Sequence, residues 1–384
     1  MAYDFNKNID RKNIYACKWD CSDNELPMWL ADMDLETAPC ILEALKKRVN
    51  NGTFGYTDIP DAWYQAIIDW YQRRHHVILD KTHIGYSTGV VAIISSAVRR
   101  FTQPGDSVIV LSPGYNIFHN SIINNGCHVL ECGLIQQEDY TYRINWTQFE
   151  EFCALEQTKM FILCNPHNPT GHFWTKDELL KIKSITHKYH VFVLSDEVHC
   201  ELTVHPEQYI PYITIDADSV SCISISKAFN CAGLQTAAFL SYNSDIRYKV
   251  WRGVNTDEVG EQNAFAIQAT LAAYNDGEDW LNNLNEFIEQ HKKYVAFYIF
   301  HHLKDLKVTP SEATYLMWID GSSLGIPHLA SRIRSINGLY LADGETYGIG
   351  GEGMLRINVA CTDEQLIEGM HRLNEAINIL LKGE

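Results

Sequence analysis

Short apolar segments separated by amphipathic helical segments are the feature of this sequence that most constrains its fold. The apolar segments span residues 107–111, 128–132, 160–164, 191–194, 220–225 and 237–240. Strands this short and this apolar are typical of a mostly parallel sheet whose two faces are both covered by helices. The sequence therefore predicts an α/β fold, with ligands expected at the carboxyl ends of the strands.

Helix signals lie between these segments and change in character toward the C-terminus. Residues 39–49 begin with a proline at a tolerated first turn, and residues 61–75 and 90–101 carry apolar side chains at helical spacing. Thr175 and Glu178 fit a capping box. From about residue 280 a long helical stretch runs to residue 302, and strands and helices then mix without regular alternation. We therefore expect a smaller α+β domain after a boundary near residue 285.

Composition limits the classes of partner. The 384 residues are enough for two domains, and 46% of them are hydrophobic, so a large core is expected. There are 48 Asp and Glu against 31 Lys and Arg, which gives a net charge of −17. This balance argues against non-specific binding to nucleic acid or to an anionic membrane.

The cysteines, the histidines and the N-terminal residues indicate the cellular location and the absence of a zinc site that we expect. The 11 cysteines are scattered without a CxxC pair, so we expect reduced thiols and a cytoplasmic protein. The 16 histidines form no HExxH motif, so a zinc site is not expected. The segment Met1–Asn6 has neither a basic start nor an apolar stretch, so no signal peptide is expected. No apolar run reaches the length of a membrane span.

A lysine follows the apolar segment 220–225, within the sequence SISKAFNCAGLQ of residues 224–235. Burial at a strand end lowers the pKa of an ammonium group, so the charge of Lys227 has to be paired, solvated or removed. A Schiff base with an aldehyde cofactor, pyridoxal 5′-phosphate (PLP), removes it chemically. Alternatively, Lys227 extends along the surface to reach water.

Two further strand ends carry polar side chains. Asn168 lies in the turn 165–171, where two prolines and a glycine follow the segment 160–164. It offers an amide to a ligand, unless the turn is only a rigid connection. Asp196 ends the segment near 191–194 and could pair with a cationic ring nitrogen. A helix cap is the commoner role for such an aspartate, and both interpretations stay open.

Three other positions fit the same kind of site. Gly89 opens a helix whose N-terminus could accept a phosphate, although the spacing matches neither a Walker A loop nor GxGxxG. Tyr115, after a Pro-Gly pair, could stack on a planar ligand or belong to the core. Arg356 lies between apolar residues of a predicted strand and requires a carboxylate, from a substrate or from an internal Asp or Glu.

In this order, the residues resemble those of fold-type I PLP enzymes, and most closely the cystathionine β-lyase (C–S lyase) family of the MalY/PatB type. The resemblance covers essentially the whole chain. It rests on the segments 18–20, 29–34, 55–57, 165–171, 196–199, 226–230, 347–348 and 356–358. It implies an aspartate aminotransferase-like fold with a mostly parallel seven-stranded sheet. The implied domains are an N-terminal arm with part of the small domain (1–45), a large PLP-binding domain (46–284) and a C-terminal small domain (285–384).

The resemblance also implies roles for individual residues. Lys227 is the implied Schiff-base lysine and Arg356 the implied ligand of the substrate α-carboxylate, in a homodimer whose active site is shared between subunits. At the cofactor ring, the implied contacts are Asp196 at the pyridine nitrogen, Asn168 at the ring oxygen and Tyr115 stacked on the ring. At the phosphate, they are the backbone of Gly89, Val90 and Val91, the Ser224 hydroxyl, and Tyr56 from the neighbouring subunit. His199 is a further implied cofactor contact.

Three positions distinguish this chain within the resemblance. Aminotransferases generally have Tyr where this chain has His199, and an Arg that binds phosphate where it has Gln235. Both residues favour a lyase, which forms a thiol, pyruvate and ammonia from L-cystathionine or another cysteine S-conjugate by β-elimination. His172 stands where an Arg often follows the glycine, which leaves a substrate-side or packing contact in doubt. An aminotransferase and a lyase with an additional regulatory, protein-binding role remain the alternatives.

Overall fold

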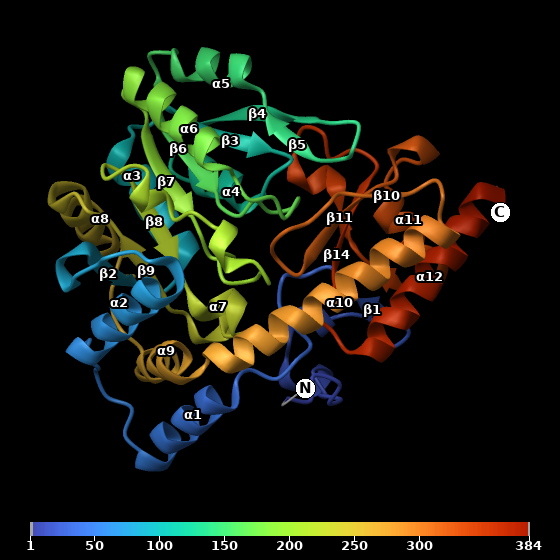
Figure 1. The fold of residues 1–384 in the computed structure, drawn as a ribbon, viewed down its shortest axis with the longest axis horizontal. Helices are drawn as coiled ribbons and strands as arrows, with labels where there is room; N and C mark the ends of the chain where they lie inside the picture. Colours follow the sequence, from blue (N-terminus) through green and yellow to red (C-terminus); the bar gives the residue numbers. More distant parts are fainter. Residues whose placement is uncertain (1–2, 383–384) are drawn as a thin grey trace.

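The larger of the two main sheets has eight strands in the order β2-β9-β8-β7-β6-β3-β4-β5 (Figure 1). The computed structural model describes residues 3–382, so the first two residues of the predicted arm and the last two of the predicted C-terminal domain lie outside it. The strands are β2 (Ile84–Ser87), β3 (Ser107–Ser112), β4 (His128–Gln136), β5 (Tyr142–Ile144), β6 (Thr158–Cys164), β7 (Phe192–Asp196), β8 (Val220–Ile223) and β9 (Ala237–Leu240).

The pairing confirms the predicted mostly parallel sheet and corrects its strand count. Four consecutive pairs, from β8 through β7, β6 and β3 to β4, are parallel. Strand β9 is antiparallel to both of its neighbours, and β5 is antiparallel to the end of β4. The sheet has eight strands rather than the expected seven because the chain folds back after β4 and adds the short strand β5.

Apolar side chains alternate between the two faces of this sheet. Val108 and Val110 pack on one face with helices α3, α4 and α8, whereas Ile109 and Leu111 pack on the other with α5 and α6. Successive side chains of a strand point to opposite faces, so a strand covered on both sides must be apolar throughout. This is why the six segments read as continuous apolar runs.

The helices confirm most of the predicted boundaries. Helix α2 has the predicted bounds, and at α6 both hydrogen bonds of the Thr175–Glu178 capping box form. The helices are α1 (Pro39–Asn51), α2 (Asp61–His75), α3 (Val90–Phe101), α4 (Ile117–Ile123), α5 (Trp146–Cys153), α6 (Lys176–Lys188), α7 (Ile225–Ala228), α8 (Ser244–Thr256), α9 (Ala264–Asp276), α10 (Glu278–His302), α11 (Leu329–Asn337) and α12 (Asp363–Lys382).

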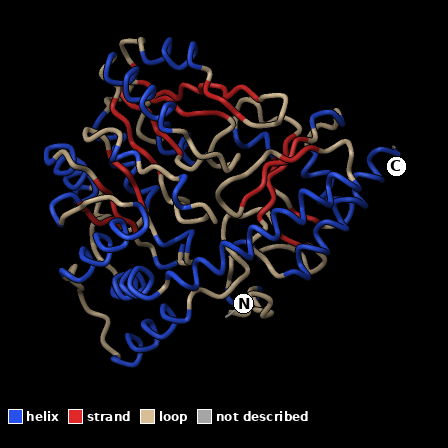
Figure 2. Tube along the Cα trace, viewed as in Figure 1, coloured by secondary structure: helices blue, strands red, loops and turns tan. Residues whose placement is uncertain are grey.

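A second, antiparallel sheet forms from the C-terminal part of the chain. Its order is β10 (Lys307–Val308), β11 (Leu316–Asp320), β14 (Met354–Asn358) and β13 (Ala342–Asp343). Strand β1 (Leu26–Pro27) pairs with β12 (Leu339–Tyr340), so the N-terminal segment joins this part. Figure 2 shows the two groups of strands apart, and Figure 1 shows the long helix α10 running from beside α9 to the smaller group. Helix α10 runs through residue 285 without a break.

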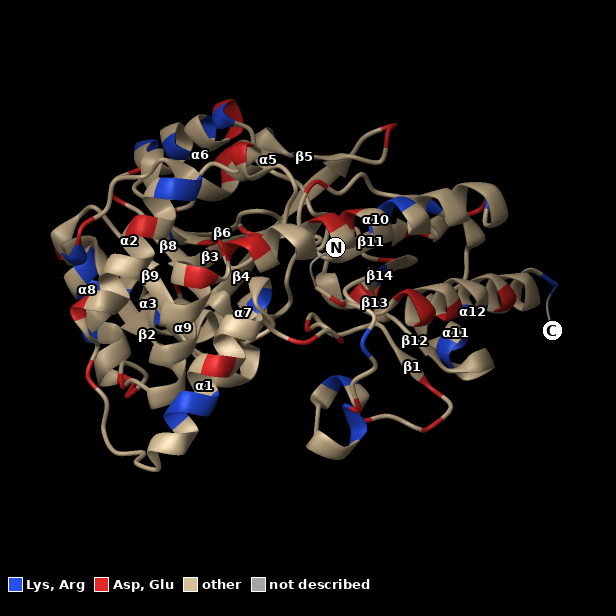
Figure 3. Ribbon diagram, turned by 60° about the horizontal axis from the view of Figure 1, so that its bottom comes forward, with Lys and Arg blue, Asp and Glu red and all other residues tan. Residues whose placement is uncertain are grey.

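Charged residues of both signs are interspersed along the helices, for example on α6, α8 and α10 (Figure 3). Among residues 3–382, no helix combines the length and the apolar character that crossing a membrane requires.

Candidate active site

A cavity of about 370 Å³ opens at the carboxyl ends of the parallel strands. The turns that follow β3, β7 and β8 contribute to its wall, because parallel strands end at the same edge of a sheet. The predicted site residues that line it are Gly89, Val90, Val91, Tyr115, Asp196, Ser224 and Lys227.

Lys227 lies in a short helix and not at the end of a strand. The predicted strand 220–225 ends at Ile223, because the Ser224 hydroxyl accepts a hydrogen bond from Ser226 N (3.0 Å) and caps the four-residue helix α7. The same hydroxyl donates to Thr236 O at 2.6 Å. The cap turns the chain so that Lys227 lines the cavity.

The ammonium group of Lys227 is enclosed by protein on the side away from the cavity. Its Nζ donates to Ala31 O at 2.6 Å, and the Tyr315 hydroxyl donates to the same oxygen at 2.9 Å. Burial and the nearby charge of Arg356 lower the pKa of Lys227 to about 8, against the opposing effect of Asp32 and Asp196. A lysine with this pKa is partly neutral near neutral pH, as a nucleophile or a base requires.

Asp196 is buried at the end of β7. Burial raises its pKa to about 7, while a hydrogen bond from Val198 N (3.1 Å) and the charge of Lys227 oppose that rise. By accepting the bond from Val198 N, Asp196 fills the cap-like role that was one of its two interpretations. Because the carboxylate also lines the cavity, it is placed to stabilise a cationic group of a ligand.

The N-terminus of α3 faces the same cavity. No side chain of residues 3–382 caps this helix, so the N–H groups of its first turn have no side-chain acceptor. Gly89 has extended backbone geometry, and a Cβ there would meet no described atom within 4 Å. Uncapped amides and the helix dipole make this end suitable for a phosphate.

Arg356 is buried in β14 and bonds to neutral groups. Nη1 donates to Asn168 Oδ1 at 3.1 Å and Nη2 to Trp29 O at 2.8 Å, while Nε has no partner among the described residues. Within residues 3–382 no carboxylate forms an ion pair with Arg356, so the internal Asp or Glu that the sequence left open is not observed. The guanidinium therefore remains available to a carboxylate ligand.

A second cavity of about 440 Å³ adjoins the first at Tyr115, which lines both. Arg356, Tyr347 and Trp29 line it as well. Lys227 and Asp196 line the first cavity and Arg356 lines the second. This arrangement suits a bound ring in the first cavity and an amino acid that reaches Arg356 from the second.

His199 is buried beside these groups. Burial and the charges of Lys227 and Arg356 hold its pKa well below the ordinary value, so the imidazole is neutral. Its Nδ1 has no partner among the described residues, and its ring lies edge-on to that of Tyr315, with centroids 6.0 Å apart.

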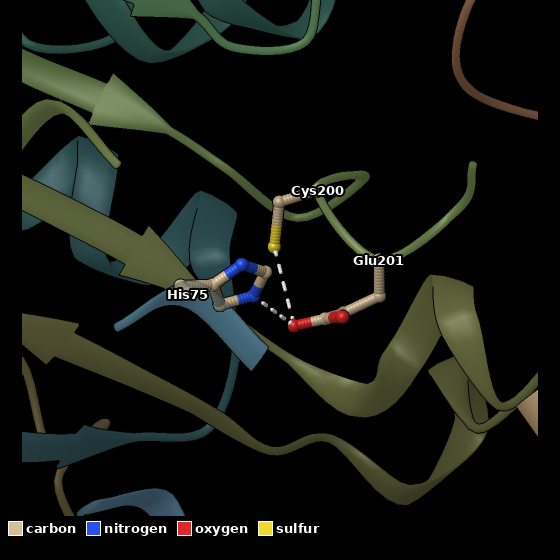
Figure 4. Close-up of side chains that lie close together, drawn as sticks. All are labelled: His75, Cys200 and Glu201. Atoms are coloured by element: carbon tan, nitrogen blue, oxygen red, sulfur yellow. Dashed lines mark hydrogen bonds and ion pairs between the residues drawn. The ribbon is translucent and has the colours of Figure 1, made fainter. Parts of the chain in front are cut away.

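The turn that carries His199 is anchored by a buried carboxylate. Glu201 accepts hydrogen bonds from Trp70 Nε1 (2.6 Å) and Arg74 Nε (2.8 Å), and His75 Nε2 lies 2.7 Å from its Oε1 (Figure 4). These partners keep the pKa of Glu201 low, at about 2, despite burial. His75, Cys200 and Glu201 are close enough to bind a metal ion. However, donors from α2 already occupy both oxygens of Glu201. We therefore interpret the cluster as an anchor of the turn that carries His199 and not as a metal site.

His172 occupies a packing position. Its ring nitrogens lie 3.8 Å from Glu178 Oε2 and 3.4 Å from Glu312 Oε2. Although burial opposes the charge, these two carboxylates raise the pKa of His172 to about 9. The histidine thus retains a positive charge at the position where the resemblance leads one to expect an arginine.

Tyr56 is the one predicted residue that this chain does not bring to the site. It lies between α1 and α2, and its side chain is fully exposed. Tyr315 is not among the predicted site residues, although its hydroxyl donates to Ala31 O, the oxygen that also accepts from Lys227 Nζ. Its only signal in the sequence is its place at the start of the apolar run Tyr315–Ile319.

Comparison with known proteins decides the family. The chain matches the family "Aminotransferase class I and II" over residues 28–373. The chain belongs to this family. It is 35% identical to cystathionine beta-lyase PatB of Bacillus subtilis, over 97% of this chain and 100% of that protein. It is 30% identical to protein MalY of Escherichia coli, over 98% and 99% of the two chains.

Solved structures extend the similarity to the whole fold. Cystalysin from Treponema denticola, which contains a pyridoxal 5′-phosphate cofactor, has a TM-score of 0.94 and 30% identity, over 99% of this chain and 100% of that one. The PLP-bound C-S lyase from Staphylococcus hominis has a TM-score of 0.92 and 28% identity, over 98% and 99%. The aspartate aminotransferase-like fold and the resemblance to the MalY/PatB lyases are thereby confirmed.

Proposed function

We propose that this chain is a PLP-dependent C–S β-lyase that cleaves L-cystathionine or a related cysteine S-conjugate to a thiol, pyruvate and ammonia. One observation carries the proposal: Lys227 and Asp196 line the same cavity, and the uncapped N-terminus of α3 faces it. The names of PatB and of the C-S lyase from Staphylococcus hominis support the reaction type.

The residues present fit PLP. Gly89, Val90 and Val91 offer backbone N–H groups for the phosphate, and the Ser224 hydroxyl lies on the same wall. Gln235 also lines the cavity and leaves the phosphate without the arginine of ordinary aminotransferases, so these backbone groups take a larger share of its charge. Asp196 would hold the pyridine nitrogen, Asn168 the ring oxygen and Tyr115 the ring face.

The catalytic groups act on the substrate from two sides. When bound, PLP supplies an electron-accepting ring that stabilises negative charge at the substrate Cα. Lys227 Nζ, whose pKa of about 8 leaves part of it unprotonated near neutral pH, takes the Cα proton. Arg356 holds the α-carboxylate and so fixes the Cα–H bond toward that amine. The neutral His199 keeps a further positive charge away from Lys227 and Arg356.

Assembly and compartment belong to the same proposal. In the proposed homodimer, Tyr56 reaches the phosphate of the neighbouring subunit, which accounts for a tyrosine fully exposed in the isolated chain. The eleven cysteines are all free thiols, which supports a cytoplasmic location. The domain boundaries 1–45, 46–284 and 285–384 remain a prediction, with α10 as the element shared across residue 285.

The test is a pyruvate-release assay on several cysteine S-conjugates, with transfer of the amino group to an added 2-oxo acid measured in parallel. The proposal predicts pyruvate formation that far exceeds amino transfer. The aminotransferase alternative predicts the reverse, because it would use the same cofactor residues.

A further inference from the structure

A turn of the C-terminal part of the chain is fastened to the large sheet next to Tyr115. The turn comprises residues 347–349 and contacts Ser112, the last residue of β3, and Glu131 in β4. Ile349 N donates to Glu131 Oε2 at 3.0 Å. The Ser112 hydroxyl lies 2.7 Å from that same oxygen and 3.1 Å from Tyr347 O, and its single proton serves one of them at a time.

The backbone of this turn is shaped for the contact. Gly348 has φ +85°, a left-handed conformation that favours glycine. A Cβ at this position would overlap both Glu131 Oε2 and Ser112 Oγ. The turn therefore approaches the two side chains more closely than any other residue type would allow.

Glu131 keeps its charge in this contact. Burial would raise its pKa, but the hydrogen bonds from Ile349 N, Ser112 and His119 hold the pKa below the ordinary value. His119 Nε2 lies 3.1 Å from Glu131 Oε1. An ionised carboxylate accepts these bonds more strongly than a neutral group does, so the turn is held by charge-assisted bonds.

The fastened turn adjoins the site: Tyr347 lines the second cavity, and the turn is bonded next to Tyr115, which lines both cavities. Gly114 N donates to Tyr347 O at 2.8 Å, so the turn is bonded to the residue that precedes Tyr115. The buried Tyr347 ring has its centroid 5.0 Å from Arg356 Cζ and lies edge-on to Trp318 at 5.3 Å. A displacement of the turn would therefore move the aromatic face against which the Arg356 guanidinium lies.

We propose that Glu131 is a positioning residue that, through the 347–349 turn, holds Tyr347 and Arg356 in place for the α-carboxylate of the substrate. The inference rests on the proposed function, in which Arg356 binds that carboxylate. The contact of Glu131 with the 347–349 turn links the two sheets and thereby sets the affinity of the site for amino acids.

The experiment is a titration of the PLP-loaded protein with L-alanine, followed by the visible absorption of the cofactor. L-Alanine carries the α-carboxylate but has no leaving group on Cβ, so the measurement does not depend on C–S cleavage. The variants are Glu131→Leu, Glu131→Gln and the control Glu150→Leu, which removes a carboxylate paired with Lys188 on the surface of α5. The affinity for PLP and the melting temperature are measured on each variant.

Glu131→Leu is expected to raise the Kd for L-alanine about tenfold or more, as expected for lost hydrogen bonds to a charged group. Glu131→Gln should stay within about threefold of the wild type, because the amide oxygen can still accept from Ile349 N and Ser112. Glu150→Leu should leave the Kd unchanged, and the PLP affinity should be similar in all four proteins.

A wild-type Kd for L-alanine in Glu131→Leu, with or without a lower melting temperature, would overturn the inference and reduce Glu131 to a structural role. If Glu131→Leu does not fold, Ser112→Ala makes the same test, since it removes the other side chain that contacts the turn. The proposed function fails separately: a wild-type protein that binds L-alanine but releases no pyruvate contradicts the lyase and leaves this inference standing.

Discussion

Arg356 and Asn168 share a hydrogen bond of 3.1 Å although 188 positions separate them in the chain. Arg356 belongs to β14 of the smaller sheet, and Asn168 to the turn after β6 of the larger one. In the proposed site, this bond joins the group that binds the substrate carboxylate to the group that binds the cofactor ring oxygen. The two sheets therefore have to be correctly packed before either group is in place.

Arg356→Lys should raise the KM for cysteine S-conjugates by roughly tenfold or more, because an ammonium cannot reproduce the planar, two-pronged contact of a guanidinium. Steady-state kinetics of pyruvate release measure this. Arg334→Lys is the matched control, because Arg334 lines the same cavity but is bonded to Glu25 at 2.6 Å and 3.0 Å. Equal effects of the two changes would argue against a special role for Arg356.

Asp196→Asn should lower the rate of elimination by about 100-fold or more, because it removes the charge that holds the ring nitrogen protonated. The rate of pyruvate release measures this.

In the cofactor-free protein, Asp196→Asn should raise the free energy of unfolding at high pH. The folded-state pKa of about 7 lies above the unfolded value of about 3.9, so the wild type loses stability as the pH rises between them. Urea unfolding midpoints at about pH 4 and about pH 8 give the comparison.

His172→Gln should destabilise the fold by about 1 to 2 kcal/mol below pH 6.5, because it removes the contacts with Glu178 and Glu312. The folded pKa of about 9 is higher than the ordinary value of 6.5. The contribution is therefore fully present below 6.5 and is lost as the pH rises through about 9. Urea midpoints of both proteins should converge above that pH. A difference independent of pH would show that the histidine acts by packing alone.

Mixing two inactive variants tests the shared site. Lys227→Ala and Tyr56→Leu should each lose most of the lyase activity. After subunit exchange, each mixed dimer combines an intact Lys227 with an intact Tyr56 at one of its two sites. An equal mixture should then recover about a quarter of the wild-type activity. No recovery, in dimers shown to have exchanged, would place Tyr56 outside the neighbouring site.

Much of the fold and site could be predicted because the constraints were local. Continuous apolar segments indicated strands covered on both faces. Asp196 ends one of these strands, and Tyr115 and Asn168 lie in turns that follow two others, as expected of a site at the carboxyl ends of strands. The capping box at Thr175 fixed the start of α6 for the same reason, because both partners lie within four residues.

What the sequence did not show depends on contacts between distant segments. The end of β8 was placed too late, because Ile225 is apolar enough for a strand and only the Ser224 cap starts the helix there. The roles of Tyr315 and Glu131 could not be predicted, because their partners Ala31 and Ile349 are backbone groups far away in the chain. Every residue except proline carries the same backbone N–H and C=O groups, so residue types do not indicate which of them a side chain contacts.

In the proposed function, Lys227, Asp196 and Arg356 together carry out β-elimination from a cysteine S-conjugate. Pyruvate release from L-cystathionine by the wild type and by Lys227→Ala, with amino transfer measured in parallel, tests it most directly. The wild type should release pyruvate with little amino transfer, and the variant should lose at least about 1,000-fold of the pyruvate-forming activity. Amino transfer without pyruvate from any cysteine S-conjugate would contradict it.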